Sequence, residues 1–168
     1  MNVGGKNKIP MATLRDSLKE AGYDEVATLL QSGNVVLRSD HSAPEVEAAV
    51  SRVIEDAFGL AVSCVALGAA DLVAMGQANA LAQPNRDPSR LVTIVLSEEP
   101  SATGRAPLPS SLGDDVLHRG RFVFQWCPEG ISNAMALTPW LEKQWSLTAT
   151  ARNWRTMTKL SSMVLEGT

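Results

Sequence analysis

The apolar residues change their spacing repeatedly along the chain, and this alternation is the feature that most limits the fold. Met11, Leu14 and Leu18 recur at helical spacing, whereas the run Leu-Val-Thr-Ile-Val-Leu at residues 91–96 is the strongest strand signal. Each half of the chain is predicted to contain a helix, a two-stranded hairpin, a second helix, a short strand and a closing helix. This order predicts an α+β fold of mostly antiparallel sheets with helices on one face.

The first half carries its own start and stop signals. Gly22 ends the first helix, and a second helix begins at Ser42 and ends at Gly59. A Ser-Gly-Asn turn predicts a hairpin, although a single strand with a bulge at Gly33 is the alternative. The predicted elements are a helix over 11–21, strands over 25–30 and 35–38, a helix between residues 42 and 59, a strand over 60–67 and a helix over 69–81.

The second half follows a loop at residues 83–88, which gives predicted domains of residues 1–84 and 85–168. Pro139 marks either a break in a helix or its true start. Because the first half has the order of a split βαβ arrangement without its first strand, both halves are predicted to be ferredoxin-like. The predicted elements of the second half are strands over 90–97, 115–118, 121–126 and 147–150, and helices over 132–145 and 152–165.

The chain of 168 residues has a net charge of −3, so nucleic-acid binding would need a local basic patch. No apolar run approaches the roughly 20 residues of a membrane helix, and the N-terminus has no apolar core of the secretory kind. Cys64 and Cys127 lie in apolar runs and are expected to be reduced thiols. These features predict a soluble, cytoplasmic protein without a cofactor or a membrane partner.

The polar residues near the N-terminus form a first candidate ligand-binding segment, which leads into a predicted helix start. Backbone N–H groups at such a position favour an anion. Glycines would allow the backbone to approach a phosphate, and lysines would add charge. The alternative is a glycine turn with two solvated lysines. The candidate residues of this segment are Asn2, Gly4, Gly5, Lys6 and Lys8.

The second candidate segment is Arg152-Asn153-Trp154-Arg155, at the start of the last predicted helix. On a helix the two arginines would share a face and grip one carboxylate or phosphate. Asn153 can donate and accept hydrogen bonds, and Trp154 offers a stacking surface of the kind used for single-stranded nucleic acids. The alternative is that Trp154 belongs to the core and the arginines pair with acidic residues.

Catalytic arrangements have little support in the sequence. His41 and His118 lie far apart, and no metal-ligand spacing accompanies them. Cys127 facing His118 across a hairpin is a conceivable nucleophile pair. The polar cluster Gln31-Ser-Gly-Asn34 is explained by bonds within a turn.

Three motifs carry a resemblance to a known family, and they are Asn2–Met11, Leu30–Val36 and Thr150–Thr156. Together they resemble the bacterial domain-of-unknown-function family 1697. The resemblance implies an α+β fold of ferredoxin-like units and no established activity or ligand. Family members have an apolar strand just before the Asn-Val-Gly-Gly motif, whereas Met1 stands there in this chain. We therefore expect a truncated chain that lacks its first strand.

These observations favour a binding module for a phosphate-bearing small molecule or nucleic acid, built on the two candidate segments. A second hypothesis is an enzyme that acts on a small anionic substrate in the same place. A third is a protein-interaction domain that self-associates through an open sheet edge.

Overall fold

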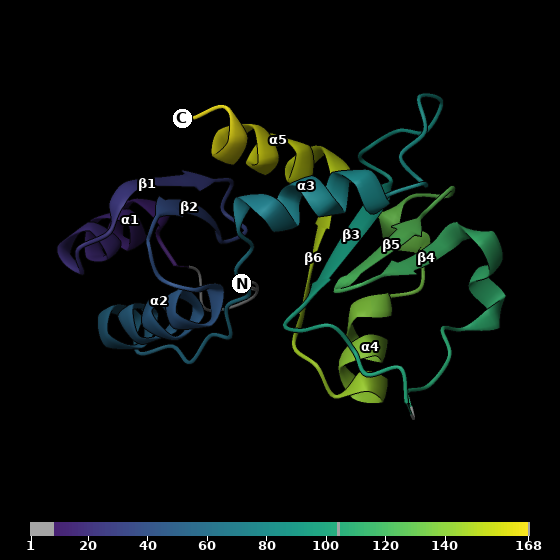
Figure 1. The fold of residues 1–168 in the computed structure, drawn as a ribbon, viewed down its shortest axis with the longest axis horizontal. Coiled ribbons are helices and arrows are strands. Elements are labelled where there is room, and N and C mark those ends of the chain that lie inside the picture. Colours follow the sequence, from purple (N-terminus) through teal and green to yellow (C-terminus); the bar gives the residue numbers. More distant parts are fainter. Residues whose placement is uncertain (1–8, 104, 168) are drawn as a thin grey trace. The chain divides into compact units, whose positions relative to one another are not determined.

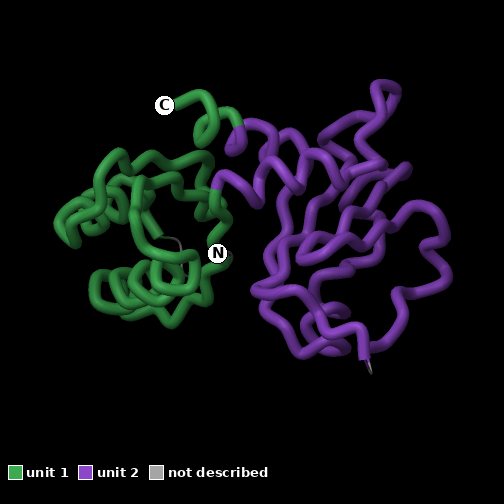
Figure 2. Tube along the Cα trace, in the orientation of Figure 1, with its two compact units in different colours: residues 1–68, 162–168 green, residues 69–161 purple. Residues whose placement is uncertain are grey.

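The computed structural model describes residues 9–103 and 105–167. The chain divides into two compact units, of which unit 1 comprises residues 1–68 and 162–168 and unit 2 comprises residues 69–161 (Figure 2). The predicted domain division at residues 84 and 85 stays a prediction. No helix in the described ranges has the length and apolar composition to cross a membrane.

Unit 1 contains the predicted hairpin between two helices. Strand β1 (Asp24–Leu29) pairs antiparallel with β2 (Asn34–Arg38), which confirms the hairpin. Helix α1 (Met11–Glu20) buries Leu14 and Leu18, and α2 (Ala43–Phe58) buries Ile54 in the same core. A capping box between Ser42 and Glu45 starts α2, because each residue bonds to the backbone of the other.

The predicted strand over residues 60–67 is wrong, because these residues have neither helical nor strand structure. The segment is held by a side chain instead of a neighbouring strand: Glu47 Oε1 accepts a hydrogen bond of 2.7 Å from the backbone N–H of Ala66. Leu60, Val62 and Cys64 pack against the core of unit 1. The apolar pattern therefore reflects packing of an irregular segment, which sequence periodicity cannot distinguish from a buried strand.

Unit 2 is built on a four-stranded antiparallel sheet in the order β4-β5-β3-β6 (Figure 1). Helix α4 (Leu137–Trp145) connects β5 to β6 in the chain, and these two strands flank β3. The ferredoxin-like character of the two halves stays a prediction. The strands are β3 (Leu91–Leu96), β4 (Val116–Arg119), β5 (Phe122–Trp126) and β6 (Ala149–Asn153).

Both faces of this sheet are covered, so the prediction of helices on one face is wrong for unit 2. Ile94 and Leu96 pack in one cluster with Leu141 of α4. On the other face Phe124 meets Trp154, the first residue of α5 (Trp154–Leu165). Figure 1 shows α4 on one side of the sheet, and α3 (Ala69–Ala78) and α5 on the other. All six residues of β3 are buried, as two covered faces require.

Helix α4 of unit 2 begins later in the chain than predicted, and unit 2 also contains two short 3-10 helices. They are η1 (Ser110–Asp115), which follows the long connection from β3, and η2 (Ile131–Asn133). Helix α4 begins at Leu137, so Pro139 lies in its first turn, where the missing N–H costs little. Of the two interpretations of Pro139, the helix start is therefore the one confirmed.

Candidate functional site

Arg152 lies on strand β6 and not on the last helix, which corrects the sequence prediction. Its register partner on β3 is Thr93, and β6 continues to Asn153 before α5 begins. Arg152 and Arg155 therefore belong to different elements and do not share a helix face. Side chains directly opposite each other in an antiparallel pair point to the same face of the sheet, so Arg152 lies on the face of Thr93.

The Arg152 guanidinium is largely withdrawn from water. Its Nη1 donates to the Thr150 hydroxyl at 3.1 Å and to the Ala151 carbonyl at 2.6 Å. Burial lowers the pKa of Arg152 from its usual value, because desolvation disfavours the charged form. The positive charge is thus held in a medium where an anion would interact with it more strongly than in water.

Thr93 is a feature of this face that sequence reasoning missed. It is fully buried in the middle of β3, with Arg152 opposite on one side and Phe124 opposite on the other. Within the described residues its hydroxyl oxygen has no hydrogen-bond partner. The sequence cannot show that a threonine in an apolar strand lacks a hydrogen-bond partner for its hydroxyl, because that depends on strand register and packing. Most buried hydroxyls are bonded, so this one is energetically costly.

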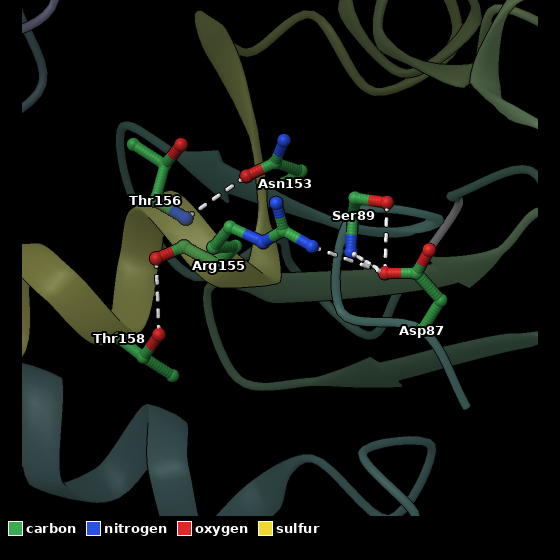
Figure 3. A network of polar contacts seen from close by, with 6 residues as sticks. All are labelled: Asp87, Ser89, Asn153, Arg155, Thr156 and Thr158. Atoms are coloured by element: carbon green, nitrogen blue, oxygen red, sulfur yellow. Dashed lines mark hydrogen bonds and ion pairs between the residues drawn. The ribbon is translucent and has the colours of Figure 1, made fainter. Parts of the chain in front are cut away.

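Asn153 has a structural role at the start of α5. Its Oδ1 accepts a hydrogen bond of 2.9 Å from the backbone N–H of Thr156, as shown in Figure 3. The geometry is that of a helix N-cap, in which the side chain satisfies the N–H group three residues later. The oxygen predicted to contact a ligand therefore bonds the helix instead.

Arg155 is exposed and pairs with an acidic loop residue. Its Nη2 lies 3.5 Å from Asp87 Oδ1 (Figure 3). Its backbone N–H donates to the Pro88 carbonyl at 3.2 Å. Hydrogen bonds from the backbone and side chain of Ser89 hold the pKa of Asp87 below its usual value. Because protein oxygens already accept the N–H groups of Arg155 and Thr156, this helix start has little left to offer an anion.

Trp154 is half-buried and packs as a core aromatic. Its ring lies edge-on to Phe124, with centroids 6.3 Å apart and an interplanar angle of 81°. This arrangement is a favourable T-shaped contact. It supports the alternative interpretation of Trp154, in which the ring fixes α5 to the sheet.

The N-terminal candidates, Asn2, Gly4, Gly5, Lys6 and Lys8, lie outside the described residues. The turn at Ser32 and Asn34 has the local bonds expected of it, since Asn34 Nδ2 donates to the Leu29 carbonyl and to the Ser32 hydroxyl. No group of three or more metal-binding side chains occurs in the described part of the chain.

The proposed Cys127–His118 pair gains no support from its surroundings. Cys127 is buried, and burial raises the pKa of its thiol, which disfavours the thiolate needed for nucleophilic attack. The Nε2 of His118 lies 2.8 Å from the Gly120 carbonyl, which can only accept, so this nitrogen carries a proton. Neither observation supports a nucleophile pair.

Comparisons with known proteins support the fold and indicate no specific activity. A conserved bacterial protein from Streptococcus pneumoniae has a similar structure, with a TM-score of 0.66 at 22% sequence identity. The alignment covers 98% of this chain and 93% of that chain. No curated protein matches the sequence. The family model for a protein of unknown function, DUF1697, matches residues 1–124, which is more than half of the chain. The chain therefore belongs to the DUF1697 family of proteins of unknown function.

Proposed function

We propose that this protein is a binding module for a phosphate-bearing ligand, and that Arg152 is its principal contact. The observation that carries the proposal is the desolvated guanidinium on the Thr93 face of the sheet. An anion that approaches a partly desolvated guanidinium is attracted to it more strongly than it would be in water.

The chemistry of the side chain favours phosphate as the anion. A guanidinium is planar and offers paired N–H donors, which match two oxygens of a phosphate. Thr150, which accepts from Arg152, helps to fix the orientation of that group on the strand. Asn2, Gly4, Gly5, Lys6 and Lys8 remain a separate proposal for an anion-binding segment, on the sequence grounds given above. Asn153 and Arg155 contribute by positioning α5 rather than by meeting the ligand.

The ligand is best identified by thermal unfolding of the wild type in the presence of inorganic phosphate, mononucleotides, sugar phosphates and short oligonucleotides. Phosphate-bearing ligands are expected to raise the melting temperature, because they bind the folded state. A shift with mononucleotides as large as that with oligonucleotides indicates a small-molecule site. A shift with oligonucleotides alone, reduced by salt, indicates nucleic acid.

Two matched variants test the place of binding. Arg152→Met removes the buried charge but keeps an apolar chain, and Arg155→Met removes an exposed charge three residues away. The shift is expected to disappear in Arg152→Met and to persist in Arg155→Met. If Arg152→Met retains the full shift, or if no phosphate-bearing compound shifts the wild type, the proposal is wrong.

The two free cysteines support a cytoplasmic location for this function. Both thiols are at least partly buried, and reduced cysteines persist in the cytoplasm of bacteria and other cells. In an oxidising compartment a free thiol would be expected to be fully shielded from oxidation. Cys64 is only half-buried. Thiol titration of protein freshly isolated from its natural host is expected to find both cysteines reduced.

The edge of the four-stranded sheet favours self-association as a second role. Strand β4 is an outer strand in the described order, and an outer strand can pair with another copy of itself. Sedimentation of the wild type is expected to show a dimer. Val116→Pro, at the first residue of β4, removes a backbone N–H that points away from β5 and is expected to be a monomer. Identical monomeric behaviour of both proteins would exclude this role.

A further inference from the structure

Trp145, at the end of α4, is a junction for three parts of unit 2. Its indole Nε1 donates to the Ala106 carbonyl at 2.8 Å, and the guanidinium of Arg105 lies 5.4 Å from the ring centre. The His118 ring of β4 contacts the same indole edge-on, with centroids 5.1 Å apart. The indole thus fastens part of the connection between β3 and η1 to the sheet and to α4.

The contacts that His118 and Arg105 make with the Trp145 ring compete if His118 acquires a proton. The Nε2 of His118 already donates to Gly120, so a second proton must go to Nδ1 and create an imidazolium. That cation would share one indole with the Arg105 guanidinium, whose charge already acts on His118, and the two cations would repel each other. Arg119 adds further positive charge near His118, whereas Glu99 acts in the opposite sense.

We infer that His118 is an acid-sensitive release for the segment around Arg105 and Ala106, which stays fastened to Trp145 while His118 is neutral. Protonation of His118 drives Arg105 from the indole and weakens the bond from Trp145 to Ala106. The inference is independent of the proposed ligand site, because it involves neither Arg152 nor Thr93.

The environment of His118 supports the direction of this change. Burial is the main cause that lowers its pKa, and the charges of Arg105 and Arg119 lower it further, while the bond to Gly120 and the charge of Glu99 raise it. The unfolded chain therefore takes up the proton at higher pH than the folded protein. Stability from neutral His118 is present above about pH 6.5 and is lost as pH falls from there through the lower folded-state pKa.

The test is a pH titration of the indole N–H resonances by ¹⁵N nuclear magnetic resonance, with Trp145→Phe used for assignment. Between about pH 7.5 and about pH 5 the Trp145 signal is expected to move toward the position of a solvent-exposed indole. In His118→Gln, which cannot become a cation, that movement is expected to be lost. His41→Gln, which removes an exposed histidine of unit 1, is the matched control and is expected to behave as wild type.

Arg105→Gln gives an independent readout of the same coupling. Removing this charge is expected to raise the apparent pKa of the Trp145 transition, because Arg105 is one cause of its low value. A Trp145 signal that does not respond to pH in the wild type, or that responds equally in His118→Gln, would overturn the inference. An unchanged transition in Arg105→Gln would overturn the proposed competition on the indole.

Discussion

At the residue scale, two threonines on one sheet face differ in a way that stability measurements can detect. Thr93 and Thr150 lie on neighbouring strands, and both are buried. The Thr150 hydroxyl accepts a hydrogen bond from Arg152, whereas the Thr93 hydroxyl has no partner within the described residues. Burying an unbonded hydroxyl is unfavourable, while removing a bonded one leaves its donor unsatisfied. The two threonines should therefore respond oppositely to the same substitution.

Thr93→Val is expected to stabilise the protein without ligand by about 1 kcal/mol, because it removes an unsatisfied polar atom with little change of shape. Thr150→Val is expected to destabilise it by a similar amount. Denaturation in urea, with both variants compared to wild type, measures the two free energies of unfolding. An equal loss in both variants would show that the Thr93 hydroxyl makes a stabilising interaction.

At the scale of elements, the junction between β6 and α5 decides which side chains remain for a ligand. Asn153 ends the strand and caps the helix, so one side chain sets where the element type changes. Asn153→Ala is expected to cost about 1 kcal/mol of stability, as loss of an N-cap usually does. Asn153→Asp keeps the accepting oxygen and is expected to retain most of that stability. Urea denaturation of the three proteins is the measurement.

The same substitution separates a capping role from a ligand role for Asn153. If Asn153→Ala unfolds like the wild type but loses the phosphate response, then Asn153 contacts the ligand and the cap is unimportant. A stability loss with the phosphate response preserved in the folded protein is the expected result, because the Asn153 oxygen is occupied by the Thr156 N–H.

At the scale of the whole molecule, the sequence predicted the elements that local chemistry determines. Ser42 predicted the start of α2, and the β-rich run at 91–96 forms the inner strand β3. The family resemblance agrees with the match over residues 1–124. The helix cap and the β-rich run are signals from residues close together in the sequence, so contacts with distant elements do not alter them.

The failures arose where contacts distant in sequence decide the structure. The segment over 60–67 has strand-like composition but is held by Glu47, which the sequence does not associate with it. The predicted strand ended at Thr150, whereas pairing with β3 extends β6 through Ala151 and Arg152. The cap signal of Asn153 would have placed the helix start correctly. The exposed position of Arg155 and its pairing with Asp87 depend on the loop before β3.

The central claim is that Arg152 binds a phosphate group, and the most direct measurement follows the arginine side chains during a titration with inorganic phosphate. The Nε–H signals of Arg152 and Arg155 can be assigned in ¹⁵N spectra from Arg152→Lys and Arg155→Lys. We predict that the Arg152 signal moves and saturates, while the Arg155 signal changes little beyond the effect of ionic strength. Saturation of the Arg155 signal alone, or no saturable change in either, would contradict the account.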